Sequence, residues 1–99
     1  MAGKKTQVVF SNVAHDQIYI IMLYIAEKGY PETAEKFSEQ LYNFGISLGV
    51  YPDKYPLCKR KPFSKRGLHC APFKKYVFVY SIQNNEVRIL SIIHSSRIL

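Results

Sequence analysis

Two histidines and one lysine in the second half of the chain are the residues best suited to acid–base chemistry. Metal-free cleavage of RNA uses the ribose 2′-hydroxyl as nucleophile. It needs a general base, a general acid and a cation that stabilises the pentavalent phosphate. Histidine titrates near neutral pH and can serve as base or acid. If the fold brings His69, Lys74 and His94 onto one rim, they form a candidate metal-independent endoribonuclease site.

Each of these residues also has a purely structural interpretation. His94 follows an apolar segment, so it is equally typical of a strand-end residue hydrogen-bonded to a backbone carbonyl. His69 is also typical of a packed or solvated strand residue. Tyr76 and Tyr80 are more typical of a core or a sheet face than of catalytic acids. The residues alone therefore leave both interpretations open.

Positive charge is concentrated in one segment. The chain of 99 residues has a formal net charge of +7, and residues 54–85 hold eight Lys and Arg with no Asp or Glu. This asymmetry is typical of a protein that binds nucleic acid or an acidic partner, although a solvated basic face gives the same pattern. A small basic nucleic-acid-binding module is one function that fits. The cations expected to contact a nucleic acid or an acidic protein are Lys59, Arg60, Lys61, Lys65, Arg66, Lys74, Lys75 and Arg97.

The two cysteines, Cys58 and Cys70, carry little signal of their own. A pair of thiols in a reducing compartment is normally unbridged, so we expect packing or surface thiols. Because no CxxC and no histidine pair lies at zinc spacing, we expect no metal and no cofactor.

Length and hydropathy favour a single domain over residues 1–99. No apolar run approaches the roughly 18 residues that span a bilayer. Basic residues at the N-terminus are not followed by the apolar run of a signal peptide. We therefore expect a cytoplasmic protein that does not enter the membrane.

Hydrophobic patterning predicts an α+β fold in the order β-α-α-β-β-β. Apolar residues recur at helical spacing in two stretches that short breaks separate, which indicates a helical hairpin. We expect the hairpin and the N-terminal strand to pack on a mostly antiparallel sheet. Neither of the last two strands alternates cleanly, so both sheet faces should meet apolar neighbours. The expected strands are 6–11, 67–71, 76–82 and 87–93, and the expected helices are 13–28 and 32–48; residues 50–66 should form a loop, part of which could pair as an edge strand.

Nearly the whole chain, residues 7–97, resembles the ParE/RelE superfamily of toxins from type II toxin–antitoxin modules. The resemblance rests on four stretches: Val9-Phe10-Ser11 with Ala14, Asp16, Ile18 and Tyr24-Ile25; Ala34-x-x-Phe37 with Leu41; Tyr76 to Ile82; and Val87 to Leu90 followed by Ile93-His94-Ser95-Ser96-Arg97. The resemblance implies a toxin neutralised by a cognate antitoxin that is often acidic where it contacts the toxin. It leaves a homodimer or a hetero-oligomer open.

The superfamily contains two kinds of toxin, and the sequence is closer to the ParE branch. RelE-like members cut mRNA, commonly on the ribosome, and ParE-like members are associated with inhibition of DNA gyrase. RelE-like enzymes typically carry an Arg where this chain has Val77, and they tend to end in an aromatic residue near the site. The resemblance therefore implies a ParE-like toxin that arrests growth by binding a macromolecular target, without chemistry of its own. The alternative is a RelE-like ribonuclease that uses His94 or His69 with the basic segment.

Overall fold

The computed structural model describes residues 6–97, and its element order is strand, two helices, three strands. Strand β1 (Gln7–Phe10) leads into helix α1 (Asn12–Glu27) and helix α2 (Pro31–Ser47). The chain then passes through two short 3₁₀ turns, Pro52–Lys54 and Ser64–Arg66. It ends in the antiparallel strands β2 (His69–Phe73), β3 (Tyr76–Gln83) and β4 (Glu86–His94), followed by a 3₁₀ turn, Ser95–Arg97. The predicted α+β fold and element order are confirmed.

Local sequence explains where the helices begin and end. Ser11 caps α1, because its hydroxyl accepts a hydrogen bond from the Ala14 N–H at 3.0 Å. The same hydroxyl donates to the Leu90 carbonyl at 2.8 Å and so ties the start of the helix to β4. Gly29 has φ +94° between the helices, a conformation that glycine adopts without strain. Pro31 then opens α2 at its first turn, where no N–H is needed.

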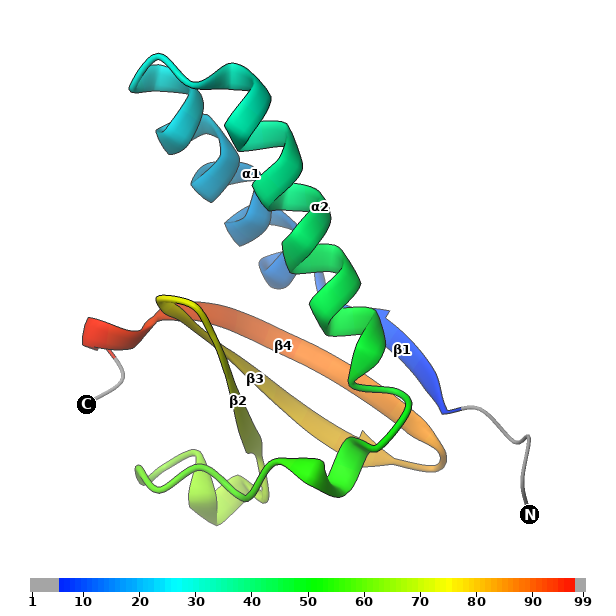
Figure 1. Cartoon of the computed structure of the whole chain (residues 1–99). Helices are drawn as coiled ribbons and strands as arrows, with labels where there is room; N and C mark the ends of the chain where they lie inside the picture. The colour runs from blue at the N-terminus through cyan, green and yellow to red at the C-terminus, as the bar shows by residue number, and fades with distance from the viewer. Residues whose placement is uncertain (1–5, 98–99) are drawn as a thin grey trace.

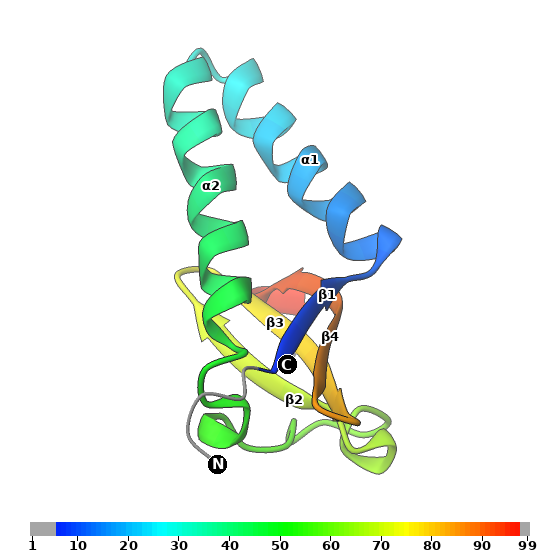
Figure 2. The same cartoon turned by 90° about the vertical axis from the view of Figure 1, so that its right-hand side faces the viewer.

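The four strands form one sheet in the order β1-β4-β3-β2. β1 pairs in parallel with β4, and the other neighbours are antiparallel. The helical hairpin rises from one face of this sheet and leaves the opposite face to the loop that precedes β2 (Figures 1 and 2). The Asn84-Asn85 turn that joins β3 to β4 has positive φ at both residues, as its composition predicts.

Both sheet faces are apolar, as the irregular patterning predicts. Four consecutive residues of β3, from Val77 to Tyr80, are buried. A bulge contributes to this pattern: Val79 lies opposite Ser91 and Tyr80 opposite Ile89, so Leu90 has no partner of its own on β3. Such an extra residue changes which side chains of β4 point to each face. The main core lies under the helices, and a smaller cluster of Cys58, Leu68 and Val79 lies under the loop.

Two expectations for the loop region require correction. The first of the three later strands begins at His69 and not at residue 67, because Gly67 takes a left-handed φ of +71° as it closes the preceding 3₁₀ turn. Cys58 and Cys70 are joined in a disulfide, so the prediction of unbridged thiols is wrong. The reason is tertiary: an isolated bridge between Leu57 and His69 places the neighbouring cysteines side by side, with their Cα atoms 4.9 Å apart.

Candidate functional site

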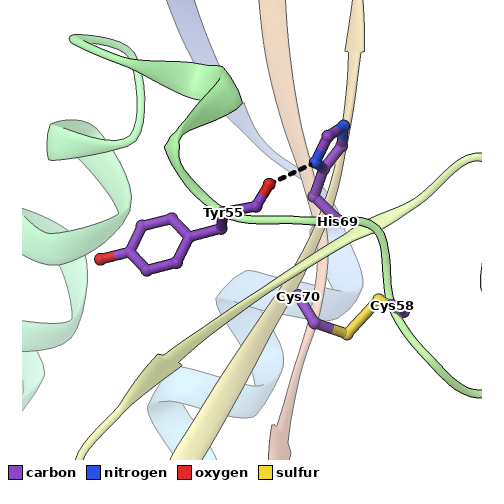
Figure 3. The surroundings of a disulfide bond; sticks show 4 residues. All are labelled: Tyr55, Cys58, His69 and Cys70. Atoms are coloured by element: carbon purple, nitrogen blue, oxygen red, sulfur yellow. Dashed lines mark hydrogen bonds between the residues drawn. A yellow bond between two sulfur atoms is a disulfide. The ribbon is translucent and has the colours of Figure 1, made fainter.

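His69 is a packed strand residue held by the backbone of the loop. Its Nδ1 lies 2.7 Å from the Tyr55 carbonyl and donates to it, because a carbonyl can only accept (Figure 3). Its ring stacks on the Tyr80 ring, with centroids 5.2 Å apart. The ring therefore uses one face for stacking and one nitrogen for a hydrogen bond.

His94 ends β4 and makes its hydrogen bonds within its own turn. Its Nδ1 accepts the Ser96 N–H at 3.2 Å and lies 2.8 Å from the Ser96 hydroxyl. This arrangement requires a bare Nδ1, so the proton of a neutral ring is on Nε2. The expected bond to a backbone carbonyl is replaced by a bond from a backbone N–H. The ring packs edge-on against Tyr76, at 5.4 Å between centroids.

The structure places the two histidines at opposite ends of the strands. His69 opens β2, and four residue steps separate it from Phe73, about 13 Å of extended chain. Phe73 lies opposite Tyr76, and Tyr76 lies opposite His94, so His94 is at the far end and two strands away. A base and an acid that act on one phosphate must both be within hydrogen-bond reach of it. His69 and His94 cannot meet this condition together.

The predicted cations divide in the same way. The loop cations, defined as Lys59, Arg60, Lys61, Lys65 and Arg66, are exposed and precede β2 at the His69 end. The end cations, defined as Lys74, Lys75 and Arg97, are exposed at the other end, where the Ser95 N–H donates to the Lys75 carbonyl at 2.8 Å. Figure 1 shows the loop and the β2–β3 turn at opposite ends of β2. The basic segment therefore makes two separate positive surfaces.

Lys74 is engaged by aromatic rings. Its ammonium lies 5.7 Å from the ring centroids of both Phe37 and Phe73, within cation–π range. Of the three residues of the candidate ribonuclease site, Lys74 and His94 share one end of the sheet, and His69 is separate.

An open groove runs between α1 and the end of β4, and we call it the α1 groove. Its volume is about 560 Å³. Ile20 and Tyr24 are exposed beside it, at 62% and 59%. Gln17 lines the groove, and its side-chain oxygen accepts the Ile92 N–H at 2.6 Å. The groove is lined by Gln17, Ile20, Ile21, Tyr24, Tyr76, Ile92, Ile93, His94, Ser96 and Arg97.

The tyrosines near the histidines are held protonated. Burial, followed by the nearby Tyr24, raises the pKa of Tyr76. Burial, with smaller effects of Tyr55 and Asp53, raises the pKa of Tyr80 to about 12, and its hydroxyl donates to the Pro52 carbonyl at 2.7 Å. Both hydroxyls are therefore hydrogen-bond donors at neutral pH and do not act as bases.

Part of this geometry has no signal in the sequence. Ile20, Leu23 and Tyr24 are exposed on α1. The crossing of α1 over β4 places Ile20 and Tyr24 in one groove with His94 and Arg97, and no local pattern indicates it. Within residues 6–97, no group of three His, Cys, Asp or Glu side chains is arranged to hold a metal. In the same described part of the chain, no helix has the length and hydropathy to cross a membrane.

Comparison with known proteins finds a family model and solved structures that match this chain. The family model described as the ParE toxin of the type II toxin–antitoxin system parDE matches residues 8–99. A solved structure titled the chromosomal ParDE toxin–antitoxin system from P. aeruginosa superimposes with a TM-score of 0.76 at 14% identity. The match covers 90% of this chain and 95% of that one. No curated protein matches. At this identity the structural match establishes the fold, and the family match covers almost the whole sequence.

Proposed function

The chain belongs to the ParE toxin family of type II toxin–antitoxin systems, and from this premise we propose that it arrests growth by binding a macromolecular target without cutting RNA. The observation that carries the proposal is the separation of His69 from His94 along the strands. DNA gyrase is the first target to test, because the resemblance to ParE-like toxins implies it. A cognate antitoxin is the proposed neutralising partner.

The position where RelE-like enzymes carry an Arg supports the same proposal. Val77 occupies it here and is buried at 8% exposure. A cation that stabilises a transition-state phosphate must reach an open site, and a buried valine cannot supply one. The remaining arrangement, His94 beside the end cations, has one imidazole, and its unprotonated Nδ1 is already engaged by Ser96. A general base needs a free lone pair within reach of the proton it removes, and Nδ1 in this arrangement does not offer one.

Controlled expression of the chain, with and without the neighbouring small open reading frame, tests the proposal. We expect growth arrest that the neighbour relieves, DNA supercoiling changes during arrest, and intact mRNA. His69→Ala and His94→Ala should arrest growth as the parent does. New mRNA 5′ ends that disappear in His94→Ala would overturn the proposal in favour of a ribonuclease.

We further propose that the antitoxin covers the α1 groove. The groove offers the exposed apolar side chains of Ile20 and Tyr24 beside the positive charge of Arg97. An acidic segment with an apolar face complements this surface. A contiguous exposed apolar patch on a protein surface often marks a site of protein–protein interaction.

A matched pair of substitutions tests this docking surface. Ile20→Asp should weaken antitoxin binding by at least about tenfold, roughly 1.4 kcal/mol, because it places a carboxylate against an acidic, apolar partner. Ile46→Asp is the control, since Ile46 is equally exposed at 57% but lies on α2 outside the groove. Titration by calorimetry gives both affinities. Equal losses in the two variants would contradict the assignment, and a loss of dimer in Ile20→Asp alone would assign the groove to self-association.

A further inference from the structure

A second groove lies beside β2, on the face of the sheet that the helices do not cover. We call it the loop groove. Its volume is about 570 Å³, and its apolar lining is Pro56, Leu57, Cys58, Cys70, Pro72 and Val77. Lys59 and Arg60 form its polar border. Leu57 is 49% exposed, which is high for an apolar residue held in a defined position.

The wall of the loop groove is fixed by covalent and backbone bonds. The Cys58 N–H donates to the Leu68 carbonyl at 2.8 Å, and the Cys70 N–H donates to the Pro56 carbonyl at 3.3 Å. The Cys58–Cys70 disulfide closes the same ladder (Figure 3). Residues 57–60 are therefore held against β2, although only a small buried cluster lies beneath them.

The charged side chains that line this groove have one sign. They are Lys59 and Arg60, and residues 54–85 contain no acidic side chain. A groove with an apolar floor and lysine at its border is complementary to carboxylates next to an apolar side chain.

The lining favours a protein segment over a nucleic acid. Proteins that bind single-stranded nucleic acid combine a positive groove with aromatic rings on which the bases stack. The loop groove is lined by proline, leucine, cysteine and valine, with no aromatic ring among the residues that line it. Pro72 has no N–H to offer at this edge of the sheet, so recognition there depends on side chains more than on strand addition.

We infer that the loop groove binds an acidic segment of a partner protein, with an apolar side chain against Leu57 and carboxylates at Lys59, and that the Cys58–Cys70 disulfide holds the groove in shape. The site is separate from the α1 groove, and the inference goes beyond the proposed function because it names the chemistry of a second docked segment. Its test does not depend on toxicity.

Fluorescence anisotropy with short labelled probes tests the inference on the whole oxidised chain. The first probe is a glutamate-rich peptide with two leucines, the second replaces its leucines with serine, and the third is an oligothymidine of similar net charge. We expect the first peptide to bind most tightly. Lys59→Glu and Leu57→Ser should each weaken it by at least about fivefold, close to 1 kcal/mol. Tightest binding of the oligothymidine, or unchanged peptide binding in both variants, would overturn the inference.

Matched controls separate this site from general charge and apolar surface. Lys36→Glu changes the net charge equally on α2, and Ile46→Ser removes an equally exposed apolar side chain there. Both should bind the peptide as the parent does. The double variant Cys58→Ser, Cys70→Ser should lose affinity by a similar factor while its circular dichroism keeps the helical signal. If the double variant binds the peptide with full affinity, the disulfide does not hold the groove in shape, and that part of the inference is wrong.

Discussion

The two faces of the sheet bury neighbouring residues of the same strand by different means. On the helix-covered face, Phe78 and Tyr80 pack with Ile18, Leu41 and Ile89, all at 2% exposure or less. On the outer face, the buried cluster among residues 6–97 consists of Val79, Cys58 and Leu68. Fully burying one aliphatic side chain contributes about 1.5–3 kcal/mol, and ordering each loop residue costs about 1–2 kcal/mol.

This difference explains why the outer face needs a covalent bond. The helices bring long apolar stripes whose burial exceeds their ordering cost. The loop of residues 52–68 brings few buried side chains, and the disulfide restrains it by limiting the freedom of the unfolded chain. The face covered by the loop has an open groove and cations over a small buried cluster, whereas the face covered by the helices holds the main core.

The largest expected effect on stability comes from substituting two adjacent residues of β3, one on each face of the sheet. Phe78→Ala should lower the free energy of unfolding by about 3–5 kcal/mol, because it opens a cavity under both helices. Val79→Ala should cost less, since its smaller side chain lies under a loop that can shift. Urea unfolding followed by circular dichroism measures both. Equal losses would show that the two faces are equally rigid.

Removal of the disulfide should have an intermediate effect that is confined to one face. The two cysteines are 12 residues apart, for which chain-entropy estimates give about 3 kcal/mol as an upper value. We expect the Cys58→Ser, Cys70→Ser variant to lose hydrogen-exchange protection at the amides of residues 58 and 70. The amides of Phe78 and Ile92 should keep theirs. Uniform loss across the sheet would contradict a local role for the bond.

The smallest of the three effects is the loss of stability that accompanies deprotonation of Tyr80 at high pH. The pKa of Tyr80 is raised to about 12 by burial, whereas an unfolded tyrosine titrates near 10. Above pH 10 the unfolded chain releases this proton first. Stability from Tyr80 is therefore complete below about pH 10 and is lost as the pH rises toward 12, by about 2–3 kcal/mol in all.

Tyr80→Phe isolates this contribution. The variant should be less stable at pH 8, by about 1–3 kcal/mol, because the Pro52 carbonyl loses its donor. It should also show a shallower fall in stability between pH 10 and 12 than the parent. Tyr51→Phe, at an exposed tyrosine, is the control and should follow the parent curve. Parallel curves for Tyr80→Phe and the parent would contradict the assigned shift.

Much of the fold could be predicted from local signals. The spacing of Ile18, Leu41 and their neighbours predicts both helices to within about two residues of their observed ends, as expected for boundaries read from caps. The turn at Asn84-Asn85 was also predictable, because both residues tolerate positive φ. The start of β2 was not, since Gly67 could equally belong to the strand or to the turn before it.

The candidate site could be predicted only as a set of residue types. The sequence identified His69, His94 and the cations, but it could not place them, because the distance between them is set by strand register. The pairing of His94 with Tyr76, and of His69 with Tyr80, is decided by contacts across strands.

By itself, the sequence determined the helices, the strands, the basic segment and the resemblance to a toxin family, because each depends on neighbouring residues or on composition. Tertiary structure alone decided that the basic segment divides into two surfaces and that the histidines lie at opposite ends of the strands. It also decided that Cys58 and Cys70 form a bond, since the pairing of Leu57 with His69 brings together residues that no local pattern connects.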